Sequence, residues 1–156
     1  GARSGTYSAG SGTSSAELKT NSFGTDSPSI IIVHVGTNLI IKNNMGEVLN
    51  KYAINTQMIN LGKLIREKHK NAKIIFSGIL NRRGIKGKEI ADINDGISYM
   101  CEQNGYLFVD PNPWIGEVGM SPDGLHLNQK GVTNLGGLFE RIIKREQEDI
   151  ETRQKN

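Results

Sequence analysis

The chain of 156 residues contains one cysteine, Cys101, so it cannot form an internal disulfide. Cys101 falls on the apolar stripe of an expected helix, which favours a buried and unreactive thiol over a nucleophile or a metal ligand. No apolar run reaches the roughly 18 residues of a membrane span, and no signal peptide is visible at the N-terminus. These absences predict an intracellular, most simply cytoplasmic, protein with one domain and no membrane span.

Motifs for metals and nucleotides are also missing. Histidines are scattered, and Asp110 and Glu117 have no partner at metal-ligand spacing, so the sequence predicts no metal site. The segment Gly84-Ile-Lys-Gly87 lacks the spacing of a phosphate-binding loop, so no nucleotide cofactor is expected. The sequence is silent on oligomeric state.

Positive charge is concentrated in one part of the chain. The net charge is +3, yet residues 63–88 contain nine basic side chains against one acid, Glu67. Such a block can attract nucleic acid, but almost no aromatic residues are interleaved with it, so a solvated face is favoured. Weak nucleic-acid contact through residues 63–88 is kept as an alternative.

Composition divides the chain into three parts. Residues 1–29 are rich in Gly, Ser, Thr and Ala and have no sustained apolar period, so we expect a flexible loop segment there. Residues 30–145 carry the apolar patterns of a folded domain. Residues 146–156 form a mixed-charge tail that is expected to fray.

Within the central part, apolar patterns of two kinds alternate. Short β-branched or aromatic runs typical of buried strands occur at residues 30–35, 73–79 and 106–109. Helical spacing of apolar residues occurs at residues 47–70 and 88–104, and again from Asn128, which is a good N-cap. Strand and helix in alternation predict a parallel sheet between two helical layers, an α/β fold of the three-layer α/β/α kind.

Polar motifs follow two of the expected strands. Gly36-Thr37-Asn38 follows the first strand, and a loop containing Asp123 and His126 follows the third. Because ligands gather at the carboxyl ends of parallel strands, these groups are expected at one rim of the sheet. A histidine oriented by a carboxylate can act as a general base, and an asparagine N–H can stabilise an oxyanion. A structural histidine bonded to Asp123, and an Asn38 that only shapes its turn, are the alternatives.

The motifs Val-Gly-Thr-Asn (35–38) and Asp-Gly-Leu-His-Leu-Asn-x-x-Gly (123–131) resemble those of the SGNH, or GDSL-type, serine hydrolases. The likeness is to compact animal and retrotransposon-encoded members, and it extends over residues 27–143. It implies a flavodoxin-like sandwich and hydrolysis of a small ester substrate. In this resemblance His126 is the base, Asp123 orients it, and Asn38 is the oxyanion donor, in a loop with Gly36 and Thr37.

The nucleophile of that family is not found. Its serine lies in a Gly-Asp-Ser turn, and this tripeptide is absent from the chain. Ser27 has similar neighbours but comes before the first strand, at the amino end of the sheet. The resemblance therefore implies that the chain begins after the nucleophile and lacks the first strands of the family fold. We expect a truncated or inactive ester hydrolase domain, or alternatively a non-catalytic binding or assembly module.

Overall fold

The computed structural model describes residues 2–8, 15–21 and 29–155 of the chain, the first two ranges as backbone strands. The strands are β1 (Ala2–Ser8), β2 (Ser15–Asn21), β3 (Ile30–Val35), β4 (Lys73–Ser77) and β5 (Leu107–Val109). The helices are α1 (Lys51–Lys68), α2 (Gly87–Asn104), α3 (Asn112–Ile115) and α4 (Gln129–Lys155). Two 3-10 turns, η1 (Thr37–Leu39) and η2 (Glu117–Gly119), lie in the loops.

A single sheet has the strand order β1-β2-β3-β4-β5. Strands β3, β4 and β5 are parallel, with Ile30 opposite Lys73 and Ile75 opposite Leu107. These are the three strands that the sequence predicts, and the helices between them make the crossovers. The predicted α/β fold with a parallel sheet is confirmed.

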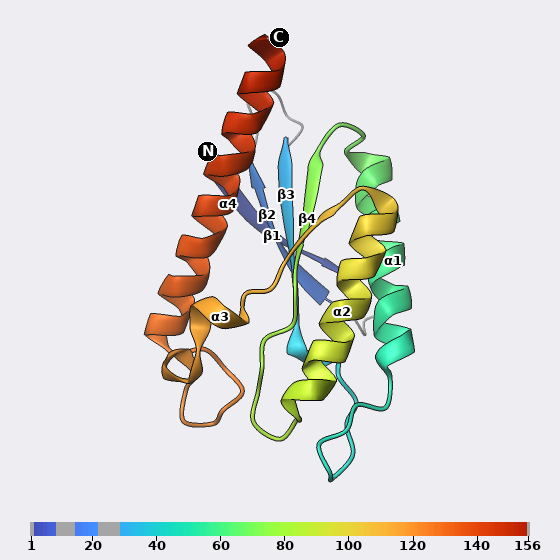
Figure 1. The fold of residues 1–156 in the computed structure, drawn as a ribbon, viewed down its shortest axis with the longest axis vertical. Coiled ribbons are helices and arrows are strands. Elements are labelled where there is room, and N and C mark those ends of the chain that lie inside the picture. The colour runs from blue at the N-terminus through green and yellow to red at the C-terminus, as the bar shows by residue number, and fades with distance from the viewer. Residues whose placement is uncertain (1, 9–14, 22–28, 156) are drawn as a thin grey trace.

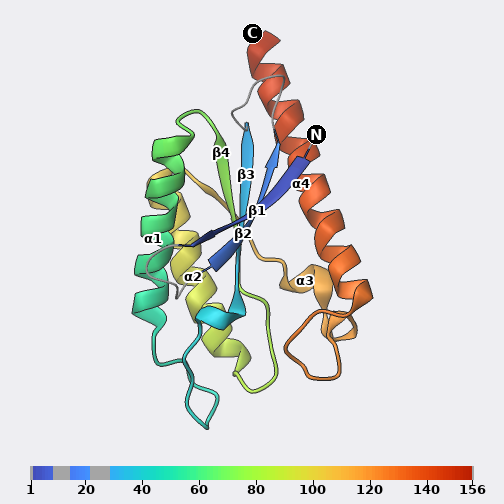
Figure 2. The same cartoon turned by 180° about the vertical axis from the view of Figure 1, so that it is seen from behind.

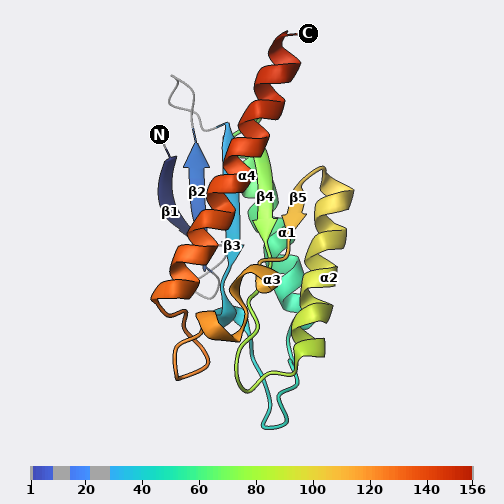
Figure 3. The same cartoon turned by 60° about the vertical axis from the view of Figure 1, so that its left-hand side comes forward.

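Helices cover both faces of the parallel strands (Figures 1 and 3). On β3, Ile31 and Val33 pack with α1 and α2, whereas Ile30 and Ile32 pack with α4. All four of these side chains are buried because alternate residues of a strand point to opposite faces of the sheet. The arrangement is therefore a three-layer α/β/α sandwich.

The N-terminal segment differs from the expectation of a loop. Strands β1 and β2 form an antiparallel pair, and β2 also pairs antiparallel with β3 (Figure 2). Periodicity did not reveal them because strand pairing is made by main-chain groups, whereas the sequence pattern reports only side-chain burial. At this edge the sheet therefore continues with two antiparallel strands. The division of the chain at residues 29 and 145 stays a prediction.

The predicted fraying of residues 146–156 is wrong for the described part, since α4 continues to Lys155. Lys73, at the start of β4, forms ion pairs with Glu146 at 2.9 Å and with Asp149. Ile150 packs against the core between α4 and the sheet. These contacts to the body of the domain support a helix that its composition alone would not stabilise.

Two predictions about buried polar groups are confirmed. Cys101 is buried, and burial raises the pKa of its thiol to about 12, so it is not a reactive nucleophile. His34 is held inside the sheet, where its Nδ1 lies 3.1 Å from Oγ of Ser77. Within the described residues, no helix is both long and apolar enough to cross a membrane.

Candidate active site

The centre of the site is the pair formed by Asp123 and His126. Nδ1 of His126 lies 2.7 Å from Oδ2 of Asp123, while Oδ1 accepts hydrogen bonds from the backbone N–H groups of Leu125 and His126. The hydrogen bond with the His126 side chain, followed by the two backbone bonds, holds the pKa of the Asp123 carboxyl well below its usual range. The carboxylate of Asp123 is therefore placed to accept a hydrogen bond from Nδ1 of the exposed His126 ring, an arrangement that would leave Nε2 without the proton.

The chain between these residues folds back on itself in a tight turn. Gly124 has a φ of 68°, in the left-handed region that glycine adopts without steric penalty. Ser121 accepts a hydrogen bond from Gly124 N–H and donates its own N–H to the carbonyl oxygen of His126, at 2.8 Å each. The turn places the carboxylate and the imidazole on the same side of the loop.

The residues that follow fix this turn to the last helix. Asn128 caps α4, because its Oδ1 accepts the N–H of Gly131 at 2.9 Å, and its Nδ2 donates to the carbonyl oxygens of Val118 and Met120. A Cβ on Gly131 would stand 2.2 Å from the carbonyl oxygen of Gly119, so no side chain fits there. The Asn-x-x-Gly part of the motif thus has a structural role.

Asn38 lies in η1, directly after β3, and is exposed. The next residue, Leu39, is buried in the core on the α1 and α2 side of the sheet. Asn50 donates from Nδ2 to the carbonyl oxygen of Leu39 at 2.8 Å and accepts Ile41 N–H through Oδ1. The side chain of Asn50 therefore fixes the chain directly after the turn that carries Gly36, Thr37 and Asn38.

The structure connects the two motifs through the loop after β4. Nη1 of Arg82 donates to the carbonyl oxygen of Thr37 at 3.4 Å, and the N–H of Arg83 donates to the carbonyl oxygen of Gly124 at 2.7 Å. Within the described residues, no hydrogen bond joins Asn38 directly to His126. The β4–α2 loop is thus bonded both to the turn that holds Asn38 and to the loop that holds Asp123 and His126.

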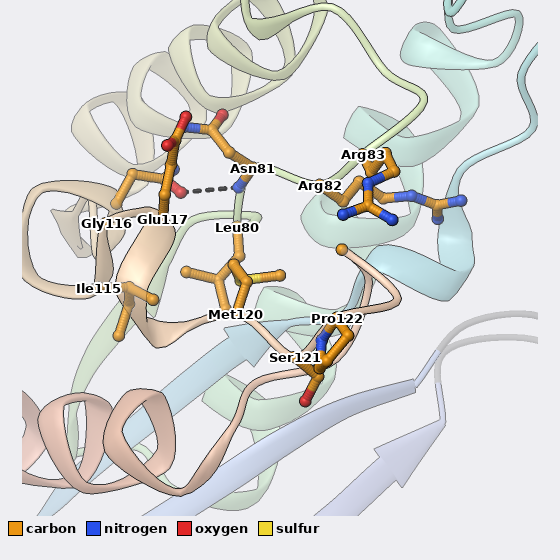
Figure 4. Close-up of a pocket in the computed structure, with 12 residues that line it drawn as sticks. Leu80, Asn81, Arg82, Arg83, Ile115, Gly116, Glu117, Met120, Ser121 and Pro122 are labelled. Atoms are coloured by element: carbon orange, nitrogen blue, oxygen red, sulfur yellow. Dashed lines mark hydrogen bonds between the residues drawn. The ribbon is translucent and has the colours of Figure 1, made fainter.

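A cavity of about 680 Å³ opens beside this loop (Figure 4). Its wall combines the β4–α2 loop with residues from Asn112 to Gly124, and Asn81 N–H donates to Oδ1 of Asn112 across it at 2.7 Å. Ser121 and Gly124 belong to the wall, whereas Asp123, His126 and Asn38 do not. The sequence gave no sign of this cavity.

The nucleophile is not located by the structure. Ser27 lies outside the described residues, and no side chain before residue 29 is described. His126 accepts no hydrogen bond from the serines whose side chains are described, which are Ser29, Ser77, Ser98 and Ser121. Among residues 29–155, no group of three or more His, Cys, Asp and Glu side chains could hold a metal ion.

The basic block does not form one surface. Residues 63–73 lie along the end of α1 and the start of β4, whereas residues 82–88 follow the opposite end of β4 (Figure 1). Lys73 is moreover engaged by Glu146 and Asp149. Nucleic-acid contact through residues 63–88 stays a prediction.

Comparison with known proteins gives structural neighbours only, since no protein-family model and no curated sequence matches the chain. A proposed acylhydrolase from Bacteroides fragilis aligns with a TM-score of 0.60 and 17% identity, over 76% of this chain and 62% of that one. The esterase domain of the ORF1 protein from the zebrafish ZfL2-1 retrotransposon aligns with a TM-score of 0.55 and 22% identity, over 72% of this chain and 66% of that one. The chain shares the α/β fold of these two structures.

These structural neighbours have the kind of α/β fold that the resemblance implies. At these identities the likeness concerns the fold alone, so the roles of Asn38, Asp123 and His126 depend on the geometry of this chain. The chain spans less than two thirds of the acylhydrolase's length.

Proposed function

We propose that this chain is a domain of an SGNH-type ester hydrolase, in which His126 is the general base and acid. The observation that carries the proposal is the 2.7 Å contact between His126 Nδ1 and Asp123 Oδ2 on an exposed loop beside a cavity. The acylhydrolase and esterase neighbours support the same reaction class. The proposed substrate is a small acyl ester.

In the proposed reaction, Nε2 of His126 takes the proton of a serine hydroxyl as the oxygen attacks the ester carbonyl carbon. The negative charge that develops on the carbonyl oxygen is stabilised by the side-chain N–H of Asn38, with backbone N–H groups of the Gly36-Thr37 turn beside it. His126 then protonates the departing alcohol, and it later deprotonates the water that hydrolyses the acyl-enzyme. The serine remains unidentified, so the residues assigned here are the base, its orienting carboxylate and one oxyanion donor.

The test is hydrolysis of p-nitrophenyl acetate by the 156-residue chain and by the longest product its gene encodes. We expect little or no turnover by the 156-residue chain, because no described serine is bonded to the base. In the longer product, His126→Gln should lower the rate roughly 10²- to 10⁴-fold, which is the usual contribution of a general base. Asn38→Ala should lower it by about 10²- to 10³-fold through loss of an oxyanion donor.

His69→Gln serves as the matched control, since His69 follows the C-terminus of α1 and comes shortly before β4 begins, whereas Asn38 follows the end of β3. Its activity should equal that of the unmodified protein. Labelling with a fluorophosphonate, followed by peptide mapping, would identify the serine. An active protein whose rate is unchanged by His126→Gln would refute the proposal.

The non-catalytic alternative makes the opposite prediction for the longest product, which would show no turnover and no labelled serine. If that product binds nucleic acid, the affinity should fall steeply with salt, since phosphate contacts release counterions.

A further inference from the structure

The cavity beside the Asp123–His126 loop has a polar end with two guanidinium groups. Arg82 and Arg83 line it together with Glu117, while Leu80, Ile115 and Met120 give it an apolar part (Figure 4). The volume of about 680 Å³ is within the usual range for a small-molecule site. A ligand there would meet positive charge and apolar surface side by side.

Neither arginine is neutralised within the part of the chain whose side chains are described. No carboxylate of residues 29–155 lies within 4.0 Å of Arg82 or Arg83, although several other basic residues are paired. Nε of Arg82 is buried and has no hydrogen-bond partner, and its Nη1 makes one long contact of 3.4 Å to Thr37. A buried N–H of this kind is costly unless a ligand or water accepts from it.

The side chain of Arg83 lies against the loop that holds Asp123 and His126. A Cβ on Gly124 would lie 2.8 Å from Nε of Arg83, so the side chain runs directly over the residue after Asp123. Arg82 extends the other way, toward the Thr37 carbonyl in the turn that holds Asn38. The two guanidinium groups therefore lie between the two loops where the ester bond would be held.

We infer that this cavity binds an oxyanion group, a carboxylate or phosphate, carried by the substrate beside its ester bond. Guanidinium groups match such groups through paired N–H donors, and the interaction is stronger than between neutral partners. The inference rests on the proposed function for its link to an ester, and it extends that function by selecting anionic esters over neutral ones. Binding of the oxyanion itself does not depend on hydrolysis.

The first experiment is a titration of the 156-residue chain with inorganic phosphate, followed by backbone amide chemical shifts. Saturable shifts are expected for residues 80–83 and 116–124, and Arg82→Gln/Arg83→Gln should weaken binding at least about 10-fold. Arg83→Gln alone, at an exposed position, should weaken phosphate binding about 3-fold or more. This single variant keeps the test valid if the double variant does not fold. Arg153→Gln, at the far end of α4, is the control and should bind normally.

Absence of saturable shifts at these residues, or equal affinity in Arg83→Gln and the unmodified chain, would overturn the inference. The second experiment uses the longest gene product and compares hydrolysis of the acetyl ester in two compounds. One is 4-acetoxybenzoate, which has a free carboxylate, and the other is methyl 4-acetoxybenzoate, in which that carboxylate is blocked. A preference of about 10-fold or more for the charged ester that is lost in Arg83→Gln is expected. Equal rates for both esters would overturn the inference while leaving the proposed ester hydrolysis intact. Phosphate binding by the 156-residue chain together with no hydrolysis by the longest gene product would contradict the proposed function alone.

Discussion

The backbone N–H of Arg83 donates a hydrogen bond of 2.7 Å to the carbonyl oxygen of Gly124. Gly124 directly follows Asp123, and the neighbouring Arg82 reaches the carbonyl oxygen of Thr37. The β4–α2 loop is therefore joined both to the loop that holds His126 and to the turn that holds Asn38. A displacement of this loop should disturb both parts of the site together.

The contact between Gly119 and Gly131 predicts a strong effect of one methyl group. Gly131→Ala should lower the free energy of unfolding by about 1–3 kcal/mol, because its Cβ would stand 2.2 Å from the carbonyl oxygen of Gly119. Urea unfolding provides the measurement. Gly137→Ala is the matched control on the same helix, since nothing lies within 4 Å of its Cβ position. Equal losses in the two variants would contradict this account of the motif glycine.

Asn94 predicts a second effect on stability. Its buried side chain accepts the N–H of Ile79 at 2.8 Å and donates to the Ile79 carbonyl oxygen at 3.0 Å, which fixes the start of the β4–α2 loop. Asn94→Ala leaves that N–H without its partner and should lower the free energy of unfolding by about 1–3 kcal/mol. Asn104→Ala, which removes a contact at the end of α2, should have a smaller effect. A larger loss for Asn104→Ala would contradict the assignment.

Lys73 predicts how the end of α4 responds to mutation and pH. Burial opposes its charge, but the hydrogen bonds that Lys73 donates to Asp149 and Glu146 outweigh this and raise the pKa of Lys73. The pKa values of the Glu146 and Asp149 carboxyls are lowered by these ion pairs. The stabilisation of the fold by the ion pairs is therefore present above the ordinary carboxyl pKa and is lost as the pH falls through the lowered values.

Lys73→Met should therefore speed amide hydrogen exchange in residues 146–155 at neutral pH. In the unmodified chain, acidification through the lowered pKa values of Glu146 and Asp149 should likewise reduce the protection factors of these amides, which correct for the slower intrinsic exchange in acid. Arg153→Gln, which removes only an exposed pair with Asp149, should change the exchange much less. Unchanged protection in Lys73→Met would show that these ion pairs do not hold the helix end.

His34 predicts a pH dependence of stability. Burial lowers the pKa of His34 to about 4 from an ordinary value of 6.5. As the pH is lowered, the unfolded chain therefore takes up a proton on His34 near pH 6.5, whereas the folded chain does so only near pH 4. The free energy of unfolding should fall by roughly 1–3 kcal/mol as the pH is lowered through this window. Urea unfolding at a series of pH values should show a shallower dependence for His34→Gln. Identical slopes would contradict the burial effect.

The sequence predicted the part of the fold that depends on side-chain burial. The run from Ile30 to Val35 is buried on both faces of the sheet, so its composition alone indicated a parallel strand. Strands β1 and β2 left no such pattern, because their pairing is made by main-chain groups, which the sequence pattern does not report. The extension of α4 also escaped prediction, since its support comes from Lys73, which is distant in sequence.

The candidate site was predictable to the extent that it is local. Asp123 and His126 are three residues apart, so one turn fixes their contact and the motif encodes it. The contact between Arg82 and Thr37 joins residues 45 positions apart and depends on β3 and β4 being neighbours. For the same reason the cavity, which is built from two separate loops, was not predictable from the sequence.

The central claim is that Asp123 holds the proton on Nδ1 of His126 and leaves Nε2 free as the base. Nitrogen-15 NMR of the His126 ring in the 156-residue chain tests it directly, at a pH where the ring is neutral. We predict that Nδ1 carries the proton and Nε2 does not, and that Asp123→Asn abolishes this preference. A ring protonated on Nε2, or a tautomer balance that Asp123→Asn leaves unchanged, would contradict the account.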